Sequence, residues 1–298
     1  MKTLVTGGTG FIGSNIAEAL LVRGDDVVIT GHDSEQQIPN FKGTLLLPSL
    51  IGIDWEALPP IDVLFHEAAY NDTRSQDLRE MLYANVASSI ALFERVAEKG
   101  CKRIVYASST AVYGDGPAPY NENQPLHPLN PYAESKKQLE EEVARFGKVH
   151  PDVVVVGLRY CNVYGPGESH KGTRASMIYQ LAGQMRRGNP RLFKSGEQRR
   201  DYIYVKDVVE ANLRAAEAQS SCVVNCGSGQ AIAFNDVVHL LNKVLGTSRT
   251  PEYIDNPFAA AYQNYTECDM SRAKEKLGFV PKYTIESGIT KYMKSGSL

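Results

Sequence analysis

This chain of 298 residues lacks long hydrophobic runs, a surplus of charge of one sign, and cysteines at metal-ligand spacing. Its apolar run at 153–158 is far shorter than the roughly 20 residues that a membrane helix needs. A formal net charge of -2 gives no electrostatic reason to bind nucleic acid or an anionic membrane. No secretory leader precedes the strand-like segment at 2–6. We therefore expect a cytoplasmic protein that binds neither nucleic acid nor membranes.

The five cysteines are Cys101, Cys161, Cys222, Cys226 and Cys268. Their spacing matches no familiar set of metal ligands, and Cys222 and Cys226 share a strand-like stretch. We expect them to be small, buried, apolar thiols in a reducing compartment, and we predict no metal site.

The order of the predicted elements indicates the fold. The hydrophobic fraction of 43% and the charged fraction of 22% are ordinary for a globular protein. We predict strands at 3–6, 26–30, 62–66, 103–107 and 152–158, and helices at 13–23, 78–99 and 131–149. This alternation predicts an α/β fold, a Rossmann-like doubly wound parallel sheet with a smaller C-terminal lobe. Ligands of such a sheet bind beyond the carboxyl ends of its strands.

A glycine-rich turn lies between the first predicted strand and the first predicted helix. Glycines at 8, 10 and 13 give the spacing G-x-G-x-x-G in the strand-to-helix context that a dinucleotide site requires. Such glycines let the backbone approach a pyrophosphate, and the helix N-terminus supplies amide donors. The turn therefore predicts binding of a nicotinamide dinucleotide.

The second predicted strand ends where many NAD-binding folds place an acidic residue against the ribose 2′-hydroxyl. Here Gly31 occupies that position and is followed by His32 and Asp33. Loss of the carboxylate removes repulsion against a 2′-phosphate, although no arginine stands beside it and Asp33 could still reach a ribose. The cofactor is therefore NADP or NAD, with NADP favoured.

Tyr132 and Lys136 are four residues apart on a predicted helix, so both side chains can serve one site. A lysine near a phenol favours the phenolate and lowers the pKa of the tyrosine, which makes a usable general base. Ser109 ends the strand that precedes this helix, where its hydroxyl can bond a substrate oxygen. Together with the glycine-rich turn, these residues predict hydride transfer to or from an alcohol carbon.

With these motifs the chain resembles the extended short-chain dehydrogenase/reductases that act as nucleotide-sugar epimerases and dehydratases. The matching segments are 6–13, 62–69, 106–114, 132–136, 159–166 and 200–207. The resemblance implies that Ser109 and Tyr132 handle the proton of the oxidised hydroxyl, while Lys136 binds the nicotinamide ribose. It also implies that Asn162 contacts the sugar or its phosphate and that Arg200 binds the nucleotide diphosphate.

The same likeness implies a tightly bound cofactor. The cofactor contacts that we expect are Gly7, Gly10, Phe11, Ile12, Gly13, His32, Asp33, Ala68, Tyr132 and Lys136.

A smaller likeness is specific to one group of these enzymes. Residues 168–176 resemble a segment of the ADP-glycero-manno-heptose 6-epimerases, in which the lysine matching Lys171 is a second acid/base group. Epimerisation through a transient ketone places the oxygen differently in its two half-reactions, so a second proton relay is chemically sensible. A surface lysine or a phosphate contact is the alternative role for Lys171. Ala261 and Gly31 both depart from the pattern of these epimerases at ligand-binding positions.

Other activities predict different features. A 4,6-dehydratase would carry Thr-Asp-Glu where this chain has Ser109-Thr110-Ala111, which argues against water elimination. A UDP-hexose 4-epimerase shares the core motifs and would not need Lys171. A net reductase would consume free cofactor, and a nucleotide sensor without catalysis would not need the tyrosine and lysine.

The sequence thus predicts an NAD(P)-dependent epimerase of a nucleotide-diphosphate sugar. We expect a dinucleotide-binding part at 1–165 and 200–226, and a substrate lobe at 166–199 and 227–298. The family resemblance also implies a homodimer, in which the helices at 78–99 and 131–149 pair into a four-helix bundle.

Overall fold

A seven-stranded parallel sheet forms the centre of the computed structural model, which describes residues 1–31, 41–46, 58–73, 75–257 and 263–298. Its strands are β1 (Lys2–Thr6), β2 (Asp26–Thr30), β3 (Thr44–Leu46), β4 (Val63–His66), β5 (Arg103–Ser109), β6 (Val154–Tyr160) and β10 (Cys222–Cys226). They lie in the order β10-β6-β5-β4-β1-β2-β3, and each neighbouring pair is parallel. The predicted Rossmann-like α/β fold is confirmed.

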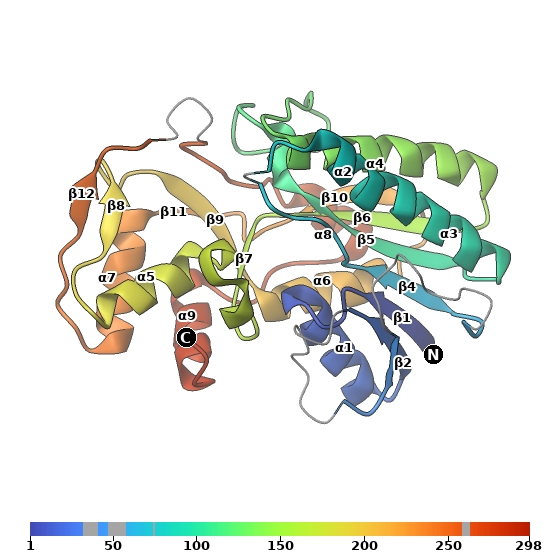
Figure 1. The fold of residues 1–298 in the computed structure, drawn as a ribbon, viewed down its shortest axis with the longest axis horizontal. Helices are drawn as coiled ribbons and strands as arrows, with labels where there is room; N and C mark the ends of the chain where they lie inside the picture. The colour runs from blue at the N-terminus through green and yellow to red at the C-terminus, as the bar shows by residue number, and fades with distance from the viewer. Residues whose placement is uncertain (32–40, 47–57, 74, 258–262) are drawn as a thin grey trace.

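Helices cover both faces of this sheet (Figure 1). One layer contains α1 (Phe11–Arg23), α6 (Val205–Ala215) and α8 (Ser271–Leu277), and the other contains α2 (Leu78–Leu82), α3 (Ser88–Glu98) and α4 (Pro131–Val149). Successive residues of a strand point to opposite faces, so Leu4 and Val5 are buried in different core clusters. Covering both faces explains the continuous apolar runs of the strands. Among the described residues, no helix combines the length and apolar composition that a membrane crossing requires.

Helix α4 begins and ends where the sequence predicts. The Asn130 side chain accepts a hydrogen bond from the Ala133 amide at 2.9 Å, and Pro131 occupies the first turn, where no amide donor is needed. The buried face of the helix contains Lys136 and, one turn later, Glu140. The same cap that starts the helix therefore fixes the position of its polar buried residues.

The helix predicted at 78–99 is present as a continuous helical segment over 78–98, but it contains an unpredicted π-helical segment, Tyr83–Ala87, between α2 and α3. The Asn85 side chain in this segment bonds the backbone N–H and C=O of Tyr70 and the Ser135 hydroxyl. A π turn shifts the register of the following residues, which lets Asn85 point inward. Apolar periodicity does not reveal such a shift.

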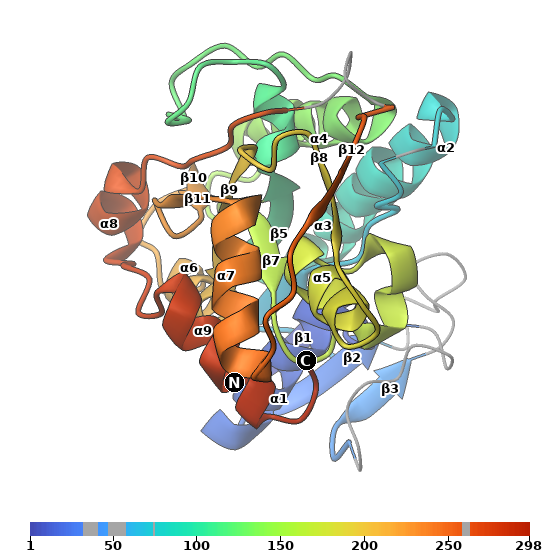
Figure 2. The same cartoon turned by 90° about the vertical axis from the view of Figure 1, so that its left-hand side faces the viewer.

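A second lobe is built around two small sheets, of which Figure 2 gives the side view. The sheets have the orders β11-β9-β7 and β12-β8, and helices α5, α7 and α9 pack against one another in a third core cluster. The elements are β7 (Asn162–Tyr164), β8 (Arg191–Phe193), β9 (Arg199–Tyr204), β11 (Ala231–Ala233), β12 (Glu252–Ile254), α5 (Met177–Met185), α7 (Phe234–Leu245) and α9 (Ile285–Lys294). The structure also contains two short 3₁₀ helices, η3 (Thr110–Tyr113) and η4 (Ser169–Arg174).

A disulfide joins Cys161, directly after β6, to Cys268, three residues before the start of α8. This corrects the expectation that all five cysteines are free thiols, because 107 residues separate the two partners and nothing in the sequence pairs them. The Asp201 carboxylate lies beside both sulfurs, but its oxygens already accept hydrogen bonds from Ser228, Gly229 and Cys268. The cluster is thus accounted for by the disulfide and these hydrogen bonds.

A buried polar network connects β5, α4 and β6 behind the carboxyl edge of the sheet. Arg159 donates two hydrogen bonds to the Glu140 carboxylate, at 2.9 and 2.6 Å, and one to the Tyr113 hydroxyl at 2.8 Å. The Ser108 hydroxyl donates to Glu140 at 2.5 Å. The side chains of Arg159 and Glu140 are only 6% and 8% exposed. Removing one partner of such a pair leaves an uncompensated buried charge.

We predict that Glu140→Gln lowers the free energy of unfolding by about 3–5 kcal/mol, because the Arg159 charge stays buried without its counter-charge. Urea denaturation followed by circular dichroism measures this. The matched control is Asp152→Asn, which removes the exposed ion pair with Lys102 and should leave the midpoint unchanged. An unchanged midpoint for Glu140→Gln would contradict the prediction.

Candidate active site

A cavity of about 920 Å³ lies at the carboxyl edge of the central sheet and extends to the second lobe. It is lined by the turns that follow β1, β4, β5 and β6, and by residues of η4, β8 and β9. A volume of this order is typical of cofactor and substrate pockets. The position agrees with the rule that doubly wound sheets bind ligands beyond the carboxyl ends of their strands.

The β1 turn and the residue after β4 touch at the point where the strand order reverses. Gly7 has a φ of +64°, and a Cβ there would lie 2.9 Å from the Ala68 nitrogen. A Cβ at Gly13 would collide with the Gly7 carbonyl oxygen. Only glycine lets these backbones approach so closely, and the space in front of them stays open for a ligand.

The start of α1 faces this space. Its N-cap residue, Gly10, offers no side chain to cap the first amides, so they remain directed at a ligand. Eight of the ten predicted cofactor residues line the cavity: Gly7, Gly10, Phe11, Ile12, Gly13, Ala68, Tyr132 and Lys136. The turn thus fits the pyrophosphate of a dinucleotide.

Gly31 also lines the cavity, at the end of β2. The Thr9 side chain fills the place that a Cβ of Gly31 would occupy, so no acidic side chain could stand there. The predicted contacts His32 and Asp33 lie outside the described residues.

Ser109, Tyr132 and Lys136 meet on one wall of the cavity, as the sequence predicts. The Lys136 ammonium donates a 2.8 Å hydrogen bond to the Ala107 carbonyl oxygen and lies 5.9 Å from the centroid of the Tyr132 ring. Burial lowers the pKa of Lys136 to about 8, opposed by the nearby carboxylates of Glu67 and Glu140. Below that pH the lysine is a cation beside the phenol.

The pKa of Tyr132 differs from the expectation. Burial raises it, a hydrogen bond with Ser109 lowers it, and the charge of Glu67 raises it further. The predicted lowering of this pKa by Lys136 is not among its causes here; burial is the largest of them, and the Lys136 ammonium lies 5.9 Å from the ring centroid. Tyr132 is accordingly a protonated phenol at neutral pH.

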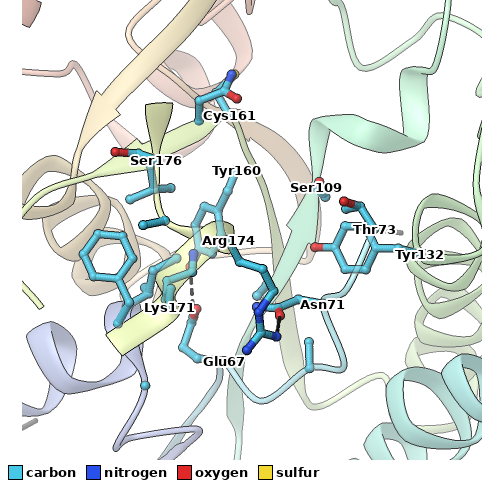
Figure 3. Close-up of a pocket in the computed structure, with 18 of the residues that line it drawn as sticks. Glu67, Asn71, Thr73, Ser109, Tyr132, Tyr160, Cys161, Lys171, Arg174 and Ser176 are labelled. Atoms are coloured by element: carbon cyan, nitrogen blue, oxygen red, sulfur yellow. Dashed lines mark hydrogen bonds between the residues drawn. The ribbon is translucent and has the colours of Figure 1, made fainter. Parts of the chain in front are cut away.

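Lys171 projects toward the middle of the cavity from the wall opposite Tyr132 (Figure 3). It belongs to η4, and its ammonium lies 5.4 Å from the centroid of the Phe11 ring. Burial lowers the pKa of Lys171, and the Glu168 carboxylate opposes that shift. The lysine is thus positioned both to reach a ligand in the middle of the cavity and to contact the phosphates near α1.

Glu168 holds the segment that carries Lys171. Its fully buried carboxylate accepts hydrogen bonds from the Gly165 amide at 3.1 Å and from the amide and hydroxyl of Ser176 at 2.5 and 3.0 Å. Its carbonyl oxygen accepts a bond from the Lys171 amide at 3.0 Å. Both ends of the 3₁₀ turn are therefore tied to one buried side chain.

The other two predicted substrate residues besides Ser109 and Lys171, namely Asn162 and Arg200, also line the cavity. Asn162 uses its amide nitrogen to bond the Asp201 carbonyl oxygen at 3.0 Å, which joins β7 to β9. The Arg200 guanidinium donates to the Arg199 carbonyl oxygen at 2.8 Å and lies 5.6 Å from the centroid of the Phe234 ring. Both side chains are held in place by the second lobe.

Sequence reasoning missed several lining residues. Arg174 donates a 3.0 Å hydrogen bond to Asn71, which connects η4 to the loop after β4 across the cavity (Figure 3). Glu67 and Tyr160 bond each other deeper in the cavity. Glu67 belongs to a segment that matches the family pattern. Its position directly after a predicted strand could have identified it as a residue of the site.

The charge of the lining favours a polyanionic ligand. Its cations are Lys136, Lys171, Arg174, Arg191 and Arg200. Over the described part of the chain, Glu67 is the one carboxylate among the lining residues. Paired phosphates suit such a set of lysines and arginines.

Comparisons with known proteins show the family of this chain. The model of the NAD dependent epimerase/dehydratase family matches residues 3–227. The ADP-L-glycero-D-manno-heptose-6-epimerase of Alkalilimnicola ehrlichii is 35% identical over an alignment of 312 residues. The alignment covers 97% of this chain and 96% of that protein.

Solved structures agree as well. The crystal structure of the Helicobacter pylori ADP-L-glycero-D-manno-heptose-6-epimerase has a TM-score of 0.89 and 35% identity, covering 99% of this chain and 95% of that one. The UDP-glucose 4-epimerase of Thermotoga maritima, solved with UDP-glucose, has a TM-score of 0.90 and 30% identity, covering 99% of each chain. This chain therefore belongs to the NAD dependent epimerase/dehydratase family.

Proposed function

We propose that the protein inverts one carbinol carbon of a nucleotide-diphosphate sugar through a transient ketone, as an ADP-heptose 6-epimerase does. The observation that carries this proposal is the placement of Tyr132 with Ser109 on one wall of the cavity and Lys171 on the opposite wall. Two acid/base groups on opposite sides suit a ketone that receives hydride on a different face from the one that lost it.

In this proposal the glycine-rich turn and Ala68 hold the cofactor pyrophosphate, and Lys136 holds the nicotinamide ribose. Bound nicotinamide dinucleotide supplies the acceptor and donor of hydride. Because the Tyr132 phenol is protonated, it donates a proton to the ketone oxygen in one half-reaction, with Ser109 bonding the same oxygen. Lys171, whose pKa burial lowers, exchanges the proton when the oxygen lies on its side.

The nucleotide diphosphate is assigned to the second lobe, where Arg200 and Asn162 line the cavity. We accordingly propose that the part expected at 1–165 and 200–226 binds the cofactor and that the lobe expected at 166–199 and 227–298 binds the sugar nucleotide, with β7 and β9, which carry Asn162 and Arg200, joined to this lobe by its sheet. The separate third core cluster, which also includes Tyr164, Tyr202 and Tyr204 of β7 and β9, supports a distinct substrate lobe.

A 4-epimerase of a UDP-hexose is the second candidate. It is favoured by the structural likeness to the UDP-glucose 4-epimerase of Thermotoga maritima, at a TM-score of 0.90. In that reaction Tyr132 and Ser109 suffice, and Lys171 serves the phosphates near Phe11.

Two finer features of the proposal concern the cofactor and the assembly. Since Thr9 leaves no room for a carboxylate at position 31, we propose that the cavity admits NADP as well as NAD, with NADP favoured. We also propose a homodimer through the helical segment 78–98 and α4, on which Leu78, Tyr83 and Val149 are exposed. A monomeric mass in light scattering at micromolar concentration would reject the dimer.

We predict that the protein, without added cofactor, converts an ADP-linked heptose to its 6-epimer with no net change in cofactor. Incubation with ADP-, GDP- and UDP-linked sugars, followed by NMR of the products, measures this. Inversion of a UDP-hexose at C4 alone would favour the second candidate. Conversion of none of the sugars would contradict the proposed function.

We predict that Lys171→Ala lowers kcat by about 10²–10⁴-fold and changes KM much less, because a proton relay acts mainly on the chemical step. Tyr132→Phe should lower kcat by a similar factor. Mixing each variant with each epimer and following the absorbance of reduced nicotinamide should show that the two variants block opposite half-reactions.

The control for these variants is Lys206→Gln, which removes an exposed lysine paired with Glu18 on the outer helices and should retain full activity. If Lys171→Ala changes only KM, Lys171 is a phosphate contact and the role of a second proton relay is refuted.

A further inference from the structure

Glu67 stands apart from the charge pattern of the cavity. It is the one carboxylate among the described lining residues, and lysines and arginines supply the remaining charge there. A carboxylate in this place would weaken the binding of phosphates by repulsion. Its presence therefore indicates a ligand group other than a phosphate.

The carboxylate of Glu67 is held in a defined position. One oxygen accepts a 2.9 Å hydrogen bond from the Tyr160 hydroxyl, which itself accepts a 2.8 Å bond from the Asn212 amide. Figure 3 shows this carboxylate pointing into the cavity below Tyr160 and Lys171. The second oxygen has no donor among the described residues of the chain, so it is free to face a ligand.

Ionising Glu67 is costly in the protein alone. Burial raises its pKa to about 7, and the bond from Tyr160 and the charge of Lys136 only partly oppose this. The other ionisable groups that interact with it are Tyr132 on α4 and Cys226 on β10. At neutral pH the carboxyl is therefore close to half ionised, and a nearby cation would ionise it fully.

The place of Glu67 identifies which part of a dinucleotide it meets. The glycine-rich turn and the start of α1 suit the phosphates, whereas Tyr132 and Lys136 mark the site of hydride transfer. Glu67 interacts electrostatically with both Tyr132 and Lys136, so it belongs to the nicotinamide end. The oxidised nicotinamide ring is a cation, and the reduced ring is neutral.

We propose that Glu67 is the counter-charge of the oxidised nicotinamide and makes the cavity bind the oxidised cofactor more tightly than the reduced one. This rests on the part of the proposed function that assigns a nicotinamide dinucleotide to the cavity. A preference for the oxidised form favours the return of hydride to the sugar ketone. An epimerase needs this bias, because it must finish each cycle with its cofactor oxidised and release no ketone.

The affinity for NAD⁺ should therefore depend on pH. The ionised carboxylate attracts NAD⁺, so NAD⁺ binding releases a proton and becomes tighter as the pH rises through about 7. NADH carries no ring charge, and its affinity should not change through Glu67. Lys136, with a pKa of about 8, stays mainly cationic over most of this range.

The test is competition between NAD⁺ and NADH for the full-length protein, with the bound NADH read by its fluorescence. We expect Glu67→Gln to shift the ratio of the two dissociation constants toward NADH by about 10- to 100-fold, the size of one close charge pair. The dependence of that ratio on pH, between about pH 6 and about pH 8, should disappear as well. The matched control is Glu18→Gln on the outer face of α1, which should change neither quantity.

A second variant keeps the test valid if Glu67→Gln does not fold. Tyr160→Phe removes the hydrogen bond that lowers the Glu67 pKa, so the pH at which NAD⁺ binding tightens should rise. An unaltered NAD⁺/NADH ratio and pH profile in both folded variants would overturn the role of Glu67. Failure of the wild-type protein to bind either nucleotide would instead overturn the proposed function.

Discussion

The close approach of the β1 turn to the end of β4 is the constraint on which the rest of the site depends. Gly7 packs against Ala68 where the strand order reverses, and a side chain at Gly7 or Gly13 would force these backbones apart. The approach aims the start of α1 at the cavity and places Glu67, directly before Ala68, at its inner end. In the proposed complex, the cofactor phosphates and the nicotinamide end would therefore meet different charges from adjacent segments.

Cations and acid/base groups line different parts of the cavity. Lysines and arginines line the places that suit phosphates, and the acid/base groups are buried enough that the pKa of Tyr132 is raised and that of Lys171 is lowered. Burial, the largest cause of both shifts, favours the neutral form of each group. In the proposed function the second lobe contributes to this chemistry as well as to substrate binding, because Glu168 fixes the turn that carries Lys171.

Local patterns made much of the fold and the site predictable. The strand-like runs and the cap at Asn130 are short-range features, and they lead to the parallel sheet and to the bounds of α4. Ser109, Tyr132 and Lys136 follow from the same logic, because the carboxyl ends of parallel strands meet at one edge.

The features that the sequence did not predict depend on contacts between residues far apart in the chain. The inward turn of Asn85 needs Tyr70 and Ser135 as partners, and the disulfide needs residues 107 positions apart. The pKa of Tyr132 depends most on burial. Glu67 became meaningful only when the structure placed it among cations and beside the acid/base pair.

The central claim is that one cavity removes a hydride from a sugar carbon and returns the same hydride to the opposite face. The most direct test uses a nucleotide sugar deuterated at the inverted carbon, incubated with the protein alone and analysed by NMR. The account predicts that the epimer keeps its deuterium at that carbon and that no label passes to water. Loss of the deuterium to solvent would contradict it, because the inversion would then proceed by proton exchange.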